Sequence, residues 1–299
     1  MITNANSSYN PDLYRALKGA SNNLGIITRV QLPLVPAGQI WGGTYSLPYY
    51  RRQDITSYFE KFDNSATYDP YASLMYTAIY LNRTWANTLF LAYTKPDTIN
   101  PKVFAPLFEM KPIGSSLRST THSNLTDELE IGGLSIRRSM VATFTHRNSA
   151  VFMDEWFKIF EAETPSMVDR IPSLVFTNNL QPWPRIITRQ ASKNGGNILG
   201  LDDDDDLTNV NLTVFWDDVE DDDVVNEMIQ DLLGKGEKLA KDMGVWNRFV
   251  YLNYAEKWQN PLRGYGDRGL DLLKEASNKY DTEKTFQLAV KGGFKMDAA

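Results

Sequence analysis

Cysteine is absent from the 299 residues of this chain, and histidine occurs only twice. Without cysteine the chain has no disulfide, no thiolate nucleophile, no iron–sulfur cluster and no cysteinyl bond to a cofactor. His122 and His146 lie far apart in the sequence, and neither has a carboxylate at metal-ligand spacing. The sequence therefore predicts no metal site.

A basic excess is also lacking, because the formal net charge is −6. Nucleic acids and anionic membranes bind through basic faces, so we expect neither as a main partner. No apolar run approaches the about 20 residues that span a bilayer, and the first residues lack the layout of a signal peptide. Sequons hint at secretion, which leaves the compartment open between secreted and cytoplasmic. They begin at Asn6, Asn82, Asn124 and Asn211.

The hydrophobic share of 42% is enough for at least one sizeable core. β-branched and aromatic runs between turn residues predict strands, and apolar residues at helical spacing predict helices. The predicted strands are 24–30, 40–47, 73–81, 88–94, 139–145, 174–181, 211–216 and 249–254. The predicted helices are 10–19, 55–62, 151–160, 222–243 and 270–279. This pattern favours an α+β fold, in which helices cover one face of an antiparallel sheet.

Two polar motifs are expected at the surface. The acidic run 202–206 is interpreted as a solvated loop rather than a calcium site, because an EF-hand loop alternates its ligands and has glycine at its sixth position. His146 and Arg147, at the end of a predicted strand, are likewise expected to be exposed.

Three separated segments resemble one family. Residues 10–28, NPDLYRALKGASNNLGIIT, are similar to the end of the flavin-binding domain of fungal berberine-bridge-like oxidoreductases. Residues 193–201 resemble the GGN-x-LGL segment of that group, and residues 251–266 and 292–295 resemble its C-terminal signature. On this resemblance, essentially the whole chain is identified with the vanillyl-alcohol-oxidase and berberine-bridge-enzyme-like FAD-linked oxidoreductases.

The resemblance also implies a domain layout. Residues 1–35 correspond to a remnant of the FAD-binding domain, 36–245 to the substrate-binding domain, and 246–299 to a C-terminal segment that returns to the FAD domain. The glycine-rich loop for the flavin pyrophosphate and the histidine that often anchors the flavin are not among these residues. We therefore expect a chain that lacks most of the FAD-binding domain, with FAD as the family cofactor and either FAD or no cofactor here.

That missing part has a consequence for association. Leu17, Leu24 and Ile26 belong to surfaces that the missing part would cover, and large uncovered apolar patches favour self-association. The expected partners are thus a small-molecule substrate and a second copy of the chain.

Alternation along the strand 174–181 places Val175, Thr177, Asn179 and Gln181 on one face. The resemblance implies that Asn179 binds substrate. It also implies a catalytic role for Gln181, which stands near the position where berberine-forming relatives have a glutamate. An amide is a poor base, so proton transfer is expected elsewhere.

Tyr254 is the better candidate for the base, because a phenol of lowered pKa can deprotonate an alcohol during hydride transfer to flavin. By resemblance, Asn253 is a hydrogen-bond partner of the cofactor. Tyr251 would lie on the opposite face of an ideal strand, and it is assigned to the substrate. The alternative for both tyrosines is packing in the core.

The remaining candidates also rest on the resemblance. Trp216 and Asn197 are assigned to the substrate, with core packing and a tight turn as their respective alternatives. Asn22, Asn23 and Gly25 match residues whose backbone approaches the flavin in full-length relatives.

Three functions remain open on the sequence. The first is an FAD-linked oxidoreductase that oxidises an alcohol, a sugar or a secondary metabolite by hydride transfer. The second is a cofactor-free cyclase or isomerase, which would act through positioning alone. The third is a non-catalytic truncated pseudoenzyme. Retention of Asn253 and Tyr254 weighs against decay, and the missing pyrophosphate loop weighs against unaided flavin catalysis.

Overall fold

The computed structural model describes residues 3–34, 38–95, 98–128, 137–201 and 205–296. The chain divides into two compact units. The terminal unit comprises Met1–Val35, Arg185–Asp205 and Asn247–Ala299, and the sheet unit comprises Pro36–Pro184 and Asp206–Trp246. Residues 185–205, which the sequence analysis places in the middle domain, therefore pack with both ends of the chain.

The sheet unit is built on an antiparallel sheet of nine strands among the described residues. The strand order is β4-β1-β3-β2-β7-β8-β6-β9, and β5 also pairs with β1. The strands are β1 (Ile40–Leu47), β2 (Ala72–Leu81), β3 (Thr84–Tyr93), β4 (Gly114–Ser115), β5 (Arg118–Thr120), β6 (Arg138–Arg147), β7 (Val175–Trp183), β8 (Leu207–Trp216) and β9 (Trp246–Asn247). The predicted strand 40–47 has the bounds of β1, and five more of the predicted strands overlap observed ones.

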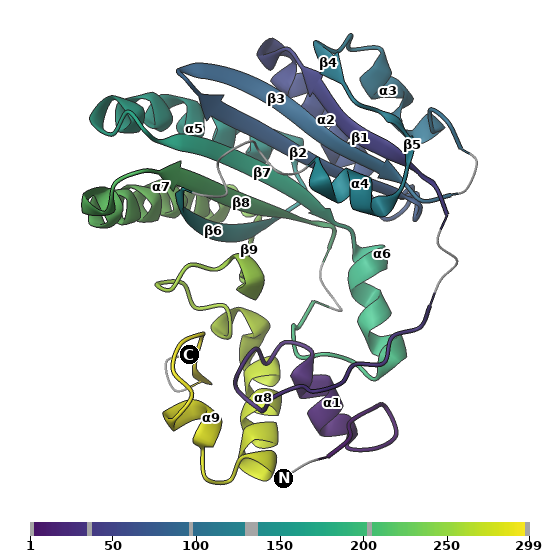
Figure 1. The fold of residues 1–299 in the computed structure, drawn as a ribbon, viewed down its shortest axis with the longest axis vertical. Coiled ribbons are helices and arrows are strands. Elements are labelled where there is room, and N and C mark those ends of the chain that lie inside the picture. Colours follow the sequence, from purple (N-terminus) through teal and green to yellow (C-terminus); the bar gives the residue numbers. More distant parts are fainter. Residues whose placement is uncertain (1–2, 35–37, 96–97, 129–136, 202–204, 297–299) are drawn as a thin grey trace. The chain divides into compact units, whose positions relative to one another are not determined.

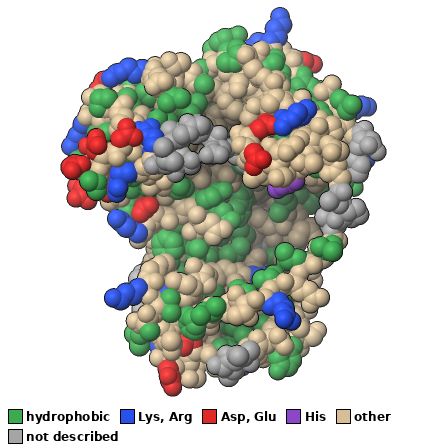
Figure 2. Space-filling view, in the orientation of Figure 1, with side chains coloured by type: hydrophobic (Ala, Val, Ile, Leu, Met, Phe, Trp, Pro, Cys, Tyr) green, Lys and Arg blue, Asp and Glu red, His purple; other side chains and the backbone are tan. Residues whose placement is uncertain are grey.

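Three helices cover one face of this sheet: α2 (Arg52–Phe62), α5 (Ala150–Arg170) and α7 (Asp222–Asp242) (Figure 1). Trp156 of α5 is fully buried, with its ring centroid 5.4 Å from that of Phe144 on β6. Acidic and basic side chains intermingle over α5 and α7 (Figure 2). The unit also contains the short helices α3 (Ala105–Phe108) and α4 (His122–Asp127). The expected α+β class, with helices over one face of an antiparallel sheet, is confirmed.

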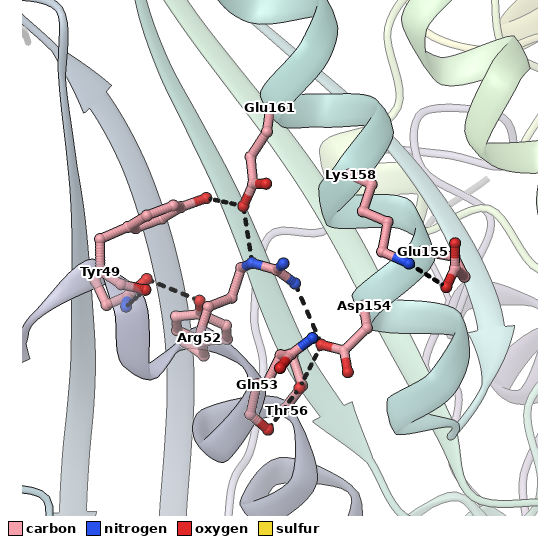
Figure 3. A network of polar contacts seen from close by, with 10 residues as sticks. Tyr49, Arg52, Gln53, Thr56, Asp154, Glu155, Lys158 and Glu161 are labelled. Atoms are coloured by element: carbon pink, nitrogen blue, oxygen red, sulfur yellow. Dashed lines mark hydrogen bonds and ion pairs between the residues drawn. The ribbon is translucent and has the colours of Figure 1, made fainter.

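Arg52 joins α2 to α5 through a partly buried polar network (Figure 3). Its Nε lies 2.7 Å from Glu161 Oε1, and its Nη1 lies 3.2 Å from Asp154 Oδ1. Tyr49 donates to the same Glu161 oxygen at 2.5 Å, and Thr56 donates to Asp154 at 2.8 Å. Burial, followed by this carboxylate, raises the pKa of Tyr49, so the phenol keeps its proton. Contact between α2 and α5 removes water from these charged and polar side chains, and the hydrogen bonds of the network take the place of those to water.

His146 is fully buried, which makes the expectation of a surface position wrong. The reason is parity, because His146 shares a face of β6 with Phe144, and this face packs beneath the helices. Its Nδ1 lies 2.8 Å from the Arg147 carbonyl oxygen, whereas its Nε2 is buried without a hydrogen-bond partner. Burial lowers the pKa of His146 to about 4.

We expect this imidazole to make stability depend on pH. The unfolded chain takes up the proton at the ordinary pKa of about 6.5, whereas the folded chain does so near pH 4, so folding is favoured above 6.5. The free energy of unfolding should therefore fall by up to about 3 kcal/mol as the pH decreases from about 6.5 to about 4. Urea unfolding of His146→Gln should lack this slope, whereas His122→Gln, at an exposed position of α4, should retain it. Equal slopes in both variants would contradict the assignment.

The terminal unit contains α1 (Pro11–Leu17), α6 (Arg185–Thr188), α8 (Gly266–Tyr280) and α9 (Thr285–Leu288). The α1 and α8 helices pack against each other, and Asp12 accepts hydrogen bonds from Lys279 at 2.7 Å and from Tyr280 at 2.9 Å. No helix in the described part of the chain is long and apolar enough to cross a membrane.

Two predicted strands in this unit are wrong. Residues 24–30 have no regular structure, and Ile26 and Val30 are 83% and 66% exposed. Residues 249–254 contain a 3₁₀ helix at Leu252–Tyr254. In both cases the β-branched and aromatic residues favour a strand, but no described segment offers their backbone a partner strand.

Candidate functional site

A row of hydroxyl and amide side chains crosses the face of the sheet opposite α2, α5 and α7, which we call the polar face. Cross-strand register aligns Thr77 of β2 with Asn179 of β7, and Asn179 with Asn211 of β8. The register continues from Asn211 to Thr143 of β6. Four neighbouring strands thus place polar side chains at one level of the sheet.

Hydrogen bonds connect this row into a network. Thr77 Oγ1 donates to Asn179 Oδ1 at 2.6 Å, and Asn179 Nδ2 donates to Thr177 Oγ1 at 3.1 Å. Asn211 Oδ1 accepts from Thr213 at 2.8 Å and from Asn179 Nδ2 at 3.3 Å. Each donor and acceptor is held at a fixed position by its neighbours, which is the preorganisation that recognition of a polyhydroxylated or phenolic ligand needs.

The polar face also has apolar borders. Met75 and Ile79 flank Thr77 along β2, and Phe90 lies on the adjacent strand β3, all half-buried. Leu125 of α4 packs near Gly42 at the β1 end of this face. A surface with a polar centre and apolar borders can bind the ring of a ligand and its hydroxyl groups together.

The structure places the sequence-predicted substrate residues differently. Asn179 and Gln181 lie on the polar face, as their alternation implies. Trp216 lies on the helix-covered face, 4% exposed, and its Nε1 donates to Asp222 Oδ1 at 2.8 Å. Trp216 is therefore corrected to a core residue that packs on the start of α7. Alternation along β8 places Trp216 on the same face as Val214, so the sequence pattern already indicated a core position.

In the terminal unit, the tyrosines of the C-terminal signature lie together. The 3₁₀ helix spaces Tyr251 and Tyr254 by about one turn, so their ring centroids are 4.8 Å apart with planes at 83°. Asn253 is exposed, and its Nδ2 donates to the Tyr251 hydroxyl at 2.8 Å. The expectation that these two rings point to opposite faces of a strand is wrong, because the segment is not a strand.

Asn22 and Asn23 use their side chains to hold the C-terminal segment. Asn23, fully buried, donates to the Phe294 carbonyl at 2.8 Å and accepts from Gln287 Nε2 at 2.8 Å. Asn22 accepts from Lys295 Nζ at 3.1 Å. Leu24 is 6% exposed, which corrects its expected exposure. A Cβ at Gly25 would meet no atom within 4 Å, so space lies beside this backbone.

The remaining predicted positions are Asn197 and the acidic run 202–206. Asn197 Oδ1 accepts from the Leu199 amide at 2.9 Å, which is the tight turn that was the alternative to a substrate role. In the acidic run, residues 202–204 lie outside the described residues, and Asp206 accepts from the Ser65 amide at 3.0 Å. Among the residues that the structure covers, no group of three or more acidic or histidine side chains could hold a metal ion.

No family model matches the chain. The FAD-dependent monooxygenase sdcF of Emericella nidulans is 31% identical over 305 residues, which cover 100% of this chain and 63% of sdcF. The chain thus spans about three-fifths of the length of this relative.

Two solved structures share the fold. 6-Hydroxy-D-nicotine oxidase of Arthrobacter nicotinovorans superposes with a TM-score of 0.68 at 14% identity, covering 98% of this chain and 62% of the oxidase. Berberine bridge enzyme of Eschscholzia californica gives 0.66 at 12% identity, covering 95% of this chain and 61% of the enzyme. These matches show that the chain has the fold of the vanillyl-alcohol-oxidase and berberine-bridge-enzyme-like flavoproteins, and its sequence is similar to that of an FAD-dependent monooxygenase.

Proposed function

We propose that this chain provides the substrate-binding part of an FAD-linked oxidoreductase that oxidises an alcohol, a sugar or a hydroxylated secondary metabolite. The observation that carries the proposal is the connected row of Thr77, Asn179 and Asn211 on the polar face. Thr77 and Asn179, both half-buried, keep acceptor lone pairs for ligand hydroxyl groups, and Asn211, which is 6% exposed, holds Asn179 in position. The FAD-dependent relatives supply the expected cofactor.

The terminal unit has residues that fit a flavin ring. The exposed Asn253 offers an amide, which has both donors and an acceptor for the polar edge of the ring, and Tyr251 orients that amide. When bound, FAD would accept a hydride from the substrate. Tyr254 would take the hydroxyl proton of the substrate as the general base. Gln181, an amide, would orient the substrate by hydrogen bonding.

The cofactor is tested first. The purified chain, incubated with excess FAD and passed through gel filtration, should retain an absorption band at about 450 nm. A panel of alcohols, sugars and phenols is then screened anaerobically for bleaching of that band. A chain that elutes without the band would contradict the flavin-linked proposal.

Variants then test the assigned roles. Tyr254→Phe should keep the band and slow bleaching by about 100-fold or more, while Tyr9→Phe, at a 58% exposed tyrosine, should bleach normally. Asn179→Val should raise the half-saturating substrate concentration about tenfold, while Ser73→Ala, exposed on β2, should not. Wild-type rates in Tyr254→Phe would exclude this phenol as the base.

A further inference from the structure

The terminal unit contains a cavity of about 790 Å³ whose lining includes neither Tyr254 nor any residue of the polar face. Its wall is formed by residues from α1, from the segment 192–200 and from 263–272 around the start of α8, together with Arg248. All of these residues belong to the terminal unit. The volume lies within the range of small-molecule sites, about 300–1,000 Å³.

Guanidinium groups dominate the charge of this cavity. Arg15, Arg248, Arg263 and Arg268 line it, whereas Asp267 is the only acidic residue in its described wall. No ion pair joins any of the four guanidinium groups to a carboxylate of the described residues. Four like charges with a single carboxylate in the same wall raise the free energy of the empty cavity, and an anion would lower it.

The wall is shaped to hold Arg248 in place. Arg248 Nη2 donates to the Gly200 carbonyl at 2.5 Å. A Cβ at Gly200 would lie 2.9 Å from that same nitrogen, and both Gly200 and Gly266 have positive φ. A side chain at either position would be strained, and at Gly200 it would also displace the guanidinium. Arg15 is held similarly, because its Nε donates to the Gly195 carbonyl at 3.2 Å.

The remaining features add positive potential. Arg263 and Arg268 are exposed, so their forks are available at the rim. The α8 helix, 15 residues long, begins at Gly266 without a side-chain cap, and its N-terminal dipole adds to the field of the arginines. Guanidinium forks match the oxygens of phosphate groups in pairs.

We propose that this cavity binds a diphosphate group, either as inorganic pyrophosphate or as part of a nucleoside diphosphate. Four guanidinium groups against one carboxylate leave a surplus of three positive charges, which suits a ligand with two adjacent phosphates better than a single carboxylate or phosphate. The proposal stands independently of the flavin-linked function, since none of the four arginines that carry it has a role in that function.

Calorimetric titration of the purified chain with inorganic pyrophosphate tests this site. Saturable binding that weakens with added salt is expected, and sulfate and succinate should bind at least tenfold more weakly. ADP identifies the source: tighter binding than pyrophosphate indicates a nucleotide, and equal binding indicates the diphosphate alone. Absence of saturable pyrophosphate binding, or equal affinity for sulfate or succinate, would overturn the proposal.

Substitutions locate the binding. Arg263→Ala and Arg268→Ala remove exposed side chains that make no described hydrogen bond, so folding should be preserved, and each should weaken pyrophosphate binding about tenfold. Arg29→Ala, an exposed arginine of the same unit outside the cavity, is the matched control and should bind as the wild type does. Equal affinity in all three variants would place the anion elsewhere and overturn the assignment.

Discussion

Replacing Arg52 with alanine should destabilise the sheet unit by about 3 kcal/mol, the typical cost of removing one partner from a buried ion pair. The Arg52 side chain is 12% exposed and bridges Asp154 and Glu161 of α5. Without it, two carboxylates remain close together and partly desolvated, and the Phe157 ring loses the guanidinium 5.2 Å from its centroid. Urea unfolding followed by tryptophan fluorescence measures the loss.

The preceding residue provides the control. Arg51 also pairs with an aspartate, Asp54 at 2.8 Å, but both side chains are solvated. Exposed pairs contribute little, so Arg51→Ala should unfold at the wild-type urea concentration. Arg52→Lys keeps the charge but loses the second hydrogen bond, and it should fall between the two. Equal midpoints for the two alanine variants would show that the network does not hold α2 on α5.

Gly269→Ala should destabilise the terminal unit, although alanine is the better helix former. A Cβ at this position in α8 would lie 2.2 Å from the Ile198 carbonyl oxygen and 2.9 Å from the Tyr265 Cβ. The helix-propensity gain of about 1 kcal/mol is outweighed by displacement of the backbone, for a net loss of about 1–3 kcal/mol. Hydrogen exchange of the α8 amides measures that loss locally.

Gly234 of α7 is the matched position, because a Cβ there meets nothing within 4 Å. Gly234→Ala should therefore stabilise the sheet unit by up to about 1 kcal/mol. The same substitution in two helices is thus expected to have opposite signs. A stabilised Gly269→Ala would show that residue 198 can move away from α8 without cost.

Helices and long strands could be predicted because their signals are local. Ile55, Tyr58, Phe59 and Phe62 repeat at helical spacing, and all four are buried on α2. The predicted strand 24–30 was wrong because β-branched composition indicates a preference for extended backbone but does not provide a partner strand. Trp216 was assigned to the substrate on the resemblance, although alternation with Asn211 and Thr213 places it on the other face.

The candidate sites depended on register and on distant segments. Alternation placed Asn179 on one face of its strand and the resemblance assigned it to the substrate, but its partners Thr77 and Asn211 required the pairing of β2 and β8 with β7. No periodicity links Arg15 to Arg248 and Arg268, which converge only through the folding of the terminal unit. Sequence patterns could not reveal an arginine cluster assembled from segments more than 200 residues apart.

Residues 185–205 belong to the terminal unit although the segments on either side of them belong to the sheet unit, so the two units are connected at several points of the chain. The backbone passes from one unit to the other after Val35, Pro184, Asp205 and Trp246. Asn179 and Asn211, paired on adjacent strands, therefore close a loop that runs through the terminal unit. A single proteolytic cut at any of these passages would leave both units covalently connected, and expressing the sheet unit alone would require a new linker from β7 to β8. Folding of the two units is thus coupled. Pairing β7 with β8 costs chain entropy, and that cost depends on how far the segment between them is already ordered in the terminal unit.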